Sequence, residues 1–263
     1  MSGADPVEAS DRASIGARLA SGWQGAVRGV LDLVYPPACA LCGGATAEPW
    51  GLCATCWSRL RFIERPYCER LGTPFAVDIG GPLLSPAAIA DPPVFQRARA
   101  VAHHDEGARA LVHRLKYGDR PELARSLGRM MARAGAELTA DAAVLVPMPL
   151  HRTRLWRRRF NQAMLLAREV GAASGLPVDP LLLARVKATK TQVGLTRAQR
   201  RENLQGAFRV PPEARARLQG RRVLLVDDVL TTGASANAAA RALLRGGAQA
   251  VDVLAFARVV ASV

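Results

Sequence analysis

Apolar and polar residues alternate with two different periods along residues 95–263. Segments typical of strands occur at 97–104, 142–149, 223–228 and 250–259, and the apolar run Val223–Val226 is short and rich in β-branched residues. Apolar residues at helical spacing occur between these runs, at 108–116, 122–135, 161–174 and 235–247. Strands separated by helices form a parallel sheet with helices on both faces. We therefore predict an α/β domain over residues 95–263.

The first 94 residues follow different patterns. An apolar stripe at steps of three or four predicts an amphipathic helix within residues 1–35, and Pro36 and Pro37 end it because proline restricts the residue before it and lacks the amide proton. Residues 36–65 carry two cysteine pairs, and residues 66–94 are rich in proline and glycine without a sustained period. We read these parts as a helical segment, a cysteine-bearing ribbon, and a linker or irregular subdomain.

Four of the five cysteines form two C-x2-C pairs. Ten residues separate the pair Cys39 and Cys42 from the pair Cys53 and Cys56. Four thiolates in two close turns can surround one tetrahedral Zn²⁺ ion and leave no open position for catalysis. We expect a cytosolic chain, where disulfides are disfavoured, so the pattern predicts a structural zinc site, with reduced or redox-active thiols as the alternative.

The fifth cysteine and two adjacent histidines do not extend the pattern of paired zinc ligands. Cys68 has Leu71 where a further C-x2-C partner would fall, so we read it as a buried or free thiol. His103 and His104 lie near a predicted strand end, where structural or surface histidines are commoner than ligands.

Hydropathy and charge limit the location and the partners. No apolar run approaches the roughly 20 residues needed to cross a bilayer, and the first residues lack the order of a signal peptide. We therefore expect a cytoplasmic protein without membrane insertion. The net charge is +14, and residues 151–222 alone carry 17 Arg or Lys against 4 Asp or Glu, a balance of +13. Such a segment favours a polyanionic or phosphorylated partner, although it is also compatible with a solvated arginine-rich face.

The segment VLLVDDVLTTGAS, residues 223–235, places two acids at the carboxyl end of a predicted central strand. Ligands bind at this end of open α/β sheets. Asp227 and Asp228 suit two vicinal hydroxyl groups, and the turn after them, with the helix N-terminus, suits a phosphate. A nucleotide hydrolase would need a G-x-x-x-x-G-K-[ST] loop, which the chain lacks. The segment therefore indicates a sugar phosphate, with a plain strand-to-helix turn as the alternative.

The segment HRTRLWRRRFNQ, residues 151–162, interleaves arginines with aromatic residues. Arginines contact phosphates, and aromatic rings stack on unpaired bases, as in proteins that bind single strands. We predict a single-stranded DNA contact here; the alternative is that the rings anchor the loop to the core. The candidate residues are Arg154, Trp156, Arg157, Arg158, Arg159 and Phe160.

Taken together, several ordered segments resemble the ComF family, whose members are associated with natural competence and DNA uptake. They are LVYPPACALC, LVHRLKYGDRPELA, VPMPLHRTRLWRRRFNQAMLLA, TKTQVGLTRAQRRENLQGAF and VLLVDDVLTTGAS, within residues 30–258. The last is similar to the phosphoribosyl pyrophosphate (PRPP) signature of type I phosphoribosyltransferases. The resemblance implies a phosphoribosyltransferase-like sheet behind a zinc ribbon, PRPP with Mg²⁺ as ligands, and proteins of the competence machinery as partners.

The resemblance also implies roles for particular residues. Asp227 and Asp228 would bind the ribose, and a loop after a helix would lie near the pyrophosphate. That loop is formed by Lys116, Tyr117 and Gly118; the 5′-phosphate residues are Thr231, Thr232, Gly233, Ala234 and Ser235. Residues 189–203 would cover the site, with Gln192, Thr196, Arg197, Arg200 and Asn203 as candidate pyrophosphate contacts.

The chain departs from the family pattern at two places. Relatives often carry a second pair of cysteine turns, of which Cys68 alone remains, and Arg159 replaces a glycine that commonly precedes Phe-Asn-Gln. No residue can be named as the proton acceptor for an incoming base. The sequence therefore predicts a PRPP-binding protein of the ComF type and leaves turnover open. The alternative is a metabolic phosphoribosyltransferase that attaches a nucleobase to ribose 5-phosphate.

Overall fold

The computed structural model describes residues 37–47, 50–78, 80–117, 120–188 and 203–260. The chain divides into two units, Met1–Cys53 and Ala54–Val263. The predicted helix within residues 1–35 lies outside the described residues. The first unit contributes an antiparallel bridge between Ala38 and Ala45 and the turn that joins them.

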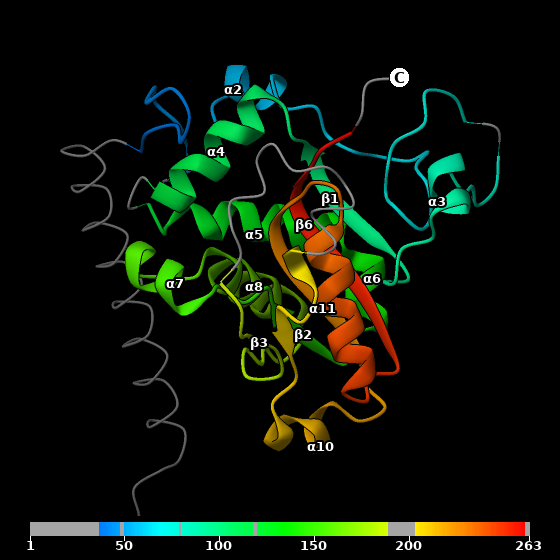
Figure 1. Ribbon diagram of the computed structural model, residues 1–263. Helices are drawn as coiled ribbons and strands as arrows, with labels where there is room; N and C mark the ends of the chain where they lie inside the picture. Colours follow the sequence, from blue (N-terminus) through cyan, green and yellow to red (C-terminus); the bar gives the residue numbers. More distant parts are fainter. Residues whose placement is uncertain (1–36, 48–49, 79, 118–119, 189–202, 261–263) are drawn as a thin grey trace, which may run out of the picture. The chain divides into compact units, whose positions relative to one another are not determined.

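The second unit is built on a four-stranded parallel sheet in the order β1-β6-β5-β2 (Figure 1). The strands are β1 (Ala98–His103), β2 (Val144–Pro147), β5 (Arg222–Leu230) and β6 (Ala250–Arg258). Nearly every residue of β5 and β6 is buried, because helices cover both faces of the sheet. Since all four strands run the same way, their carboxyl ends meet at one edge.

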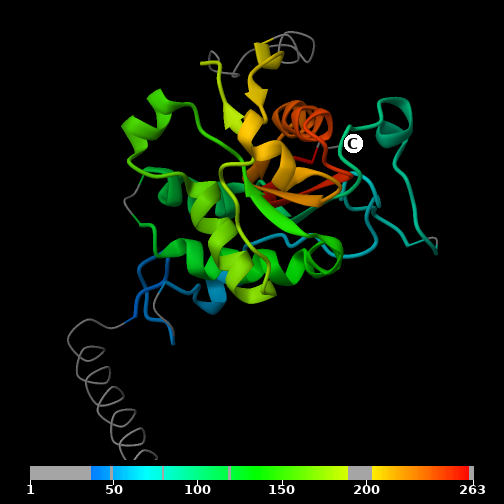
Figure 2. The ribbon, with the colours of Figure 1, turned by 90° about the horizontal axis from the view of Figure 1, so that it is seen from below.

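Helices of different chain regions cover the two faces of this sheet (Figures 1 and 2). α5 (Leu123–Ala134) and α8 (Gln162–Ser174) pack side by side on one face, and α11 (Ala234–Arg245) lies on the other. Gly128 allows the close approach of α5 to α8, because a Cβ atom there would lie 2.3 Å from Cβ of Glu169. The apolar stripes of these helices thus form the two core layers.

The remaining elements of this unit are short. Before the sheet lie α2 (Ala54–Ser58) and α3 (Pro86–Ala90); α4 (Glu106–Tyr117) and α6 (Ala136–Asp141) lie between β1 and β2. They are followed by α7 (Arg152–Arg158), by the antiparallel pair β3 (Ala184–Arg185) and β4 (Phe208–Arg209), and by η1 (Pro212–Ala214) and α10 (Arg215–Leu218).

The predicted parallel α/β sheet with helices on both faces is confirmed. All four predicted strands and the four helices between them are present, with ends shifted by a few residues. The segment 66–94 contains α3 and isolated bridges from Tyr67 to Pro74 and from Cys68 to Leu83. It also packs against the sheet unit, because the N–H of Ala98 donates to the carbonyl of Arg70 at 2.9 Å.

Candidate functional site at the carboxyl edge of the sheet

Two acids and a lysine meet at the carboxyl end of β5. Asp228 is only 4% exposed, and its Oδ1 lies 2.8 Å from Nζ of Lys116, which α4 brings across the edge. Its Oδ2 is buried and has no hydrogen-bond partner among the described residues. Asp227 is partly buried, and its Oδ1 accepts the backbone N–H of Asp228 at 2.9 Å. The pair therefore offers unused acceptor capacity beside one fixed positive charge.

The local electrostatics oppose ionisation of both acids together. Burial, and then the charge of Asp228, raise the pKa of Asp227 to about 7, although Lys116 and Arg185 act in the opposite direction. Burial, followed by the charges of Arg109 and Lys116, lowers the pKa of His104, which directly follows β1 at the same edge of the sheet. A hydroxyl donor near Asp227 would replace the solvent contact that burial removes.

The turn after the acids leads directly into α11. Gly233 caps the helix with φ of 75°, a conformation that favours glycine, and its carbonyl accepts the N–H of Asn237 at 2.8 Å. Thr231 and Thr232 are exposed before it. The free N–H groups of a helix N-terminus attract an anion. The predicted phosphate residues 231–235 therefore lie at one strand end with the two acids.

The end of α4 also contacts the arginine-rich segment. Nη2 of Arg158, in α7, donates to the hydroxyl of Tyr117 at 2.8 Å, and its guanidinium carbon lies 4.9 Å from the centre of the tyrosine ring. Lys116, the preceding residue, pairs with Asp228. Gly118, the third residue of this predicted loop, lies outside the described residues. Two segments that were predicted separately, 116–117 and 154–160, thus share a contact.

The aromatic residues of the predicted DNA contact differ in exposure. Trp156 is 85% exposed in α7, whereas Phe160 is partly buried. Together with Arg152, Leu155 and Arg159, Trp156 lines a hollow of about 910 Å³. Arg159 has φ of 63° at the end of α7, a backbone conformation that favours glycine. Arg154 is partly buried, and only the backbone of Arg157 is described.

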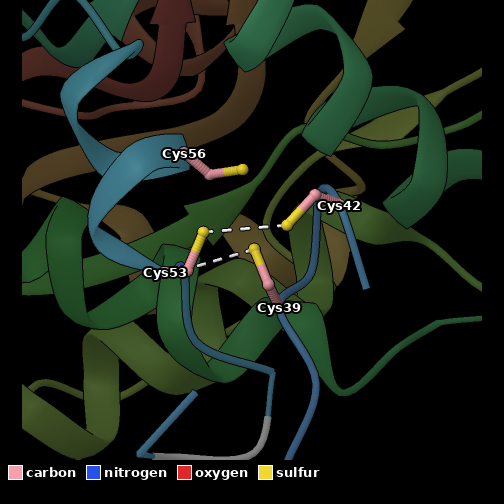
Figure 3. Close-up of side chains that lie close together, drawn as sticks. All are labelled: Cys39, Cys42, Cys53 and Cys56. Carbon is pink, nitrogen blue, oxygen red and sulfur yellow. Dashed lines mark hydrogen bonds between the residues drawn. The ribbon is translucent and has the colours of Figure 1, made fainter. Parts of the chain in front are cut away.

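The four cysteines of the two pairs come together (Figure 3). Their Sγ atoms all lie within 4.8 Å of one another, and those of Cys42 and Cys53 are 3.7 Å apart. Bonds of about 2.3 Å to a tetrahedral Zn²⁺ place two sulfurs about 3.8 Å apart. Burial acts in the opposite direction, yet backbone N–H groups, including that of Cys53 at 3.3 Å, lower the pKa of Cys39 to about 6. The donor set therefore fits zinc.

Cys68 lies in a second, similar turn that lacks three of the four cysteines. Residues 68 and 71 and residues 85 and 88 repeat the pair spacing, but read Cys-x2-Leu and Ser-x2-Ala. The thiol of Cys68 is buried and accepts N–H groups from Ser85 at 3.2 Å and Leu71 at 3.4 Å. Hydrogen bonds to the thiol hold this turn, and the five cysteines of the chain can form one four-thiolate site but not two.

Matches to known families agree with this architecture. The double zinc ribbon domain matches residues 30–87, and the phosphoribosyl transferase domain matches residues 166–262. The class is therefore a phosphoribosyltransferase-like sheet domain with an N-terminal zinc ribbon.

Two relatives that match most of the chain show its family. DNA utilization protein YhgH of Escherichia coli strain K12 is 33% identical over 232 residues, which cover 86% of this chain and 99% of that protein. Competence protein F of Haemophilus influenzae is 30% identical over 217 residues, covering 79% of this chain and 90% of that protein. The chain belongs to the ComF family.

Solved structures are less similar in sequence to this chain than the two relatives above. The glutamine PRPP amidotransferase of B. subtilis matches with a TM-score of 0.37 and 20% identity, covering 54% of this chain and 30% of that one. The purine phosphoribosyltransferase of Pyrococcus horikoshii matches with a TM-score of 0.29 and 15% identity, covering 49% and 66%.

Some residues at this edge were not among the predicted site residues. Arg185, in β3, lies close enough for its charge to act on the pKa of Asp227. Arg258 ends β6, in register with Leu230. The position of Arg258 at the end of a predicted strand was a readable signal, whereas nothing in the sequence indicates that the charge of Arg185 acts on Asp227. The predicted covering residues 192, 196, 197 and 200 lie outside the described residues; Asn203 is partly buried.

Proposed function

We propose that the chain binds PRPP at the carboxyl edge of its sheet and engages single-stranded DNA through the segment 151–162. PRPP binding is supported by the position of Asp227, Asp228 and the α11 N-terminus at one strand end. DNA binding is supported by the exposed Trp156 within an arginine-rich helix and by the names of the relatives, which refer to DNA utilization and competence.

Each part of PRPP has a matching group. The carboxylates of Asp227 and Asp228 accept the ribose hydroxyls, and the turn 231–235 binds the 5′-phosphate. Lys116 lies beside the acids and is available to the pyrophosphate once the ribose takes its place on Asp228. Mg²⁺ would neutralise charge on the pyrophosphate when bound with it, and the unpartnered Oδ2 of Asp228 is compatible with a nearby donor or cation.

The DNA part follows from charge and ring exposure. Arg154, Arg158 and Arg159 would contact backbone phosphates, and Trp156 would stack on a base without reading sequence. Binding of this kind weakens steeply with salt. We place the protein in the cytoplasm, where proteins of the competence machinery would be its partners. Among the described residues, no helix is long and apolar enough to span a membrane.

Titrations with the wild-type chain test both halves. PRPP with Mg²⁺ should bind more tightly than ribose 5-phosphate or pyrophosphate alone, because only PRPP fills the acid pair, the turn and the lysine together. A fluorescent single-stranded oligonucleotide should bind at low salt. Equal affinity for PRPP and pyrophosphate would count against the sugar site, and no oligonucleotide binding would remove the DNA half.

The alternative function is metabolic transfer of ribose 5-phosphate to a nucleobase. It is favoured by a cavity beside the phosphate turn, lined by Phe95 and Arg258. Pyrophosphate release measured with a panel of purine and pyrimidine bases separates the two functions, because a PRPP-binding adaptor would release none above the rate without a base.

A further inference from the structure

An exposed line of side chains runs along helix α4. Arg109, His113 and Tyr117 follow one another at steps of four residues, so they lie above one another on one face of the helix. All three are exposed, whereas the buried residues of α4 face the core on its other side. At a rise of about 1.5 Å per residue, the line is about 12 Å long. It offers a ring at two positions and a guanidinium at the third.

Tyr117 connects this line to α7, the neighbouring helix (Figure 1). Its ring centre lies 4.9 Å from that of His113, and the two ring planes are inclined by 44°. Arg158 of α7 holds the same residue through the hydrogen bond to its hydroxyl and the contact with its ring. Tyr117 is nevertheless 61% exposed. The ring is therefore fixed by two neighbours and still open to a ligand, which lowers the entropy lost when a ligand stacks on it.

Tyr117 and the residue before it serve different surfaces. Successive side chains of a helix point about 100° apart. Lys116 reaches the acid pair, where its Nζ lies 2.8 Å from Oδ1 of Asp228, and Tyr117 contacts Arg158 instead. The last turn of α4 therefore separates the two proposed sites, because Lys116 belongs to the sugar phosphate edge and Tyr117 belongs to the arginine-rich segment.

The charges of α4 and α7 fit a polyanion. After Glu106 at its first position, α4 carries three Arg or Lys residues and no acid, and α7, of sequence RTRLWRR, carries no acid at all. Exposed arginines contact phosphates, and rings exposed between them stack on unpaired bases. A duplex keeps its bases paired and would leave these rings unused, so the combination favours a single strand.

We propose that a single DNA strand bound at α7 continues along α4. Trp156, Tyr117 and His113 contact successive bases, and Arg158 and Arg109 contact the phosphates between them. This longer site extends the DNA part of the proposed function and rests on it. It adds a second helix to the contact, and it does not depend on PRPP.

Strand length separates the two helices in a binding experiment. Fluorescence anisotropy at low salt measures the affinity of labelled oligothymidines of about 4 and about 12 nucleotides, lengths within the range of single-strand sites. Combined Arg109→Gln and His113→Ala substitutions, the α4 variant, should weaken binding of the longer strand about tenfold, because it loses a phosphate contact and a base contact. The shorter strand should keep its affinity within about twofold, since α7 alone accommodates it. Trp156→Ala should weaken binding of both strands.

Tyr117 provides a second test within the line. Tyr117→Ala should weaken binding of the longer strand severalfold, and Tyr117→Phe should retain most of the affinity because it keeps the ring. Arg245→Gln is the control for net charge, since Arg245 is exposed at the end of α11 that points away from the carboxyl edge. It should leave the ratio of the two affinities unchanged. Because all these substituted side chains are exposed, thermal melting should give the wild-type Tm for each variant.

Several results would overturn the proposal. These are an unchanged affinity of the longer strand in the folded α4 variant, an equal decrease for both strand lengths, or a decrease of the same size in Arg245→Gln. A duplex of about 12 base pairs that binds as tightly as the single strand would also contradict it, because stacking would then contribute nothing. Wild type that binds neither strand contradicts the DNA part of the proposed function. Wild type whose binding of both strands depends on Trp156 but not on α4 contradicts the longer site alone.

Discussion

Asp227 lies in the proposed ribose site, in surroundings that disfavour the ionised form of its carboxyl group. Its pKa of about 7 in the folded chain, raised by burial and then by Asp228, lies well above the value of about 3.9 for an exposed aspartate. The folded state therefore holds a proton that the unfolded chain releases. The associated stability is complete below about pH 4 and is lost as pH rises through about 7.

Asp227→Asn should remove this dependence. At pH 8 the variant should be more stable than wild type, by on the order of 2 kcal/mol, and the difference should shrink as pH falls toward 5. Urea unfolding at several pH values measures the free energies of unfolding of both proteins. A difference that stays constant with pH, or a less stable variant at pH 8, would mean that Asp227 is not held in this environment.

A substitution at Gly233 tests whether the turn 231–235 binds phosphate, because it changes the preferred backbone φ angle at a single residue of that turn. A Cβ atom there meets nothing closer than 3.7 Å, so Gly233→Ala adds backbone strain at φ of 75° without a clash. It should cost about 1 kcal/mol of stability and weaken PRPP binding severalfold. Gly175→Ala is the matched control, because Gly175 has φ of 74°, ends α8 and has open space around it.

In this pair of variants, denaturation should show a similar loss of stability for both, and calorimetry should show weaker PRPP binding only for Gly233→Ala. Retained affinity in Gly233→Ala would remove the turn from the site.

The residues of the candidate edge were predictable to different degrees. Asp227 and Asp228 lie near the end of the β5 sequence and the phosphate turn follows it, so the rule that ligands bind at the carboxyl ends of strands finds them. The ion pair of Lys116 with Asp228 and the contact of Arg158 with Tyr117 join segments separated by 112 and 41 positions. Such contacts depend on tertiary packing, which periodicity does not contain.

At the scale of elements, the four-cysteine cluster makes a clear prediction about metal. Cys42→Ser should lose the single zinc ion that we expect per chain and loosen the ribbon, because three thiolates bind zinc less well than four. Cys68→Ser should keep the ion, since Cys68 lies in the turn held by hydrogen bonds. Elemental analysis of freshly purified proteins measures both. Zinc retained by Cys42→Ser at the wild-type level would contradict the assignment.

If helix α7 contacts DNA, its arginines determine how steeply DNA binding weakens with salt. Replacement of Arg157, Arg158 and Arg159 by Gln should weaken binding of a single-stranded oligonucleotide and flatten the plot of log affinity against log salt, because fewer counterions are released. A variant with Arg125, Arg129 and Arg133 replaced carries the same change in net charge on α5, where these residues are exposed.

Fluorescence anisotropy at several salt concentrations distinguishes the two triple variants. An equal decrease in slope for both would indicate a response to net charge alone, and would remove α7 as the contact.

The longer strands and helices could be predicted from the sequence. Buried parallel strands and the helices that cover them require long apolar runs and stripes, and β5, β6, α5 and α11 carry them. The short elements α6, α7, α10 and the pair β3 and β4 have too few residues for a periodic signal. Glycines and prolines in segment 66–94 concealed the bridges there, since backbone hydrogen bonds leave little trace in the sequence.

At the scale of the whole chain, most of the net positive charge lies in one segment, and that segment contacts the candidate site. Residues 151–222 carry a balance of +13 out of +14. Arg158 of this segment contacts Tyr117, whose neighbour Lys116 pairs with Asp228. Anionic ligands of both proposed kinds would therefore meet positive charge near the carboxyl edge of the sheet.

The central claim is that Asp227 and Asp228 accept the hydroxyls of a phosphorylated ribose. Calorimetric titration of PRPP with Mg²⁺ into wild type, Asp227→Asn and Asp228→Asn tests it most directly, with thermal melting to establish that each variant is folded. Each substitution should weaken PRPP binding by about tenfold or more, because a charged acceptor is replaced by a neutral amide. Equal affinity in all three folded proteins would contradict the account.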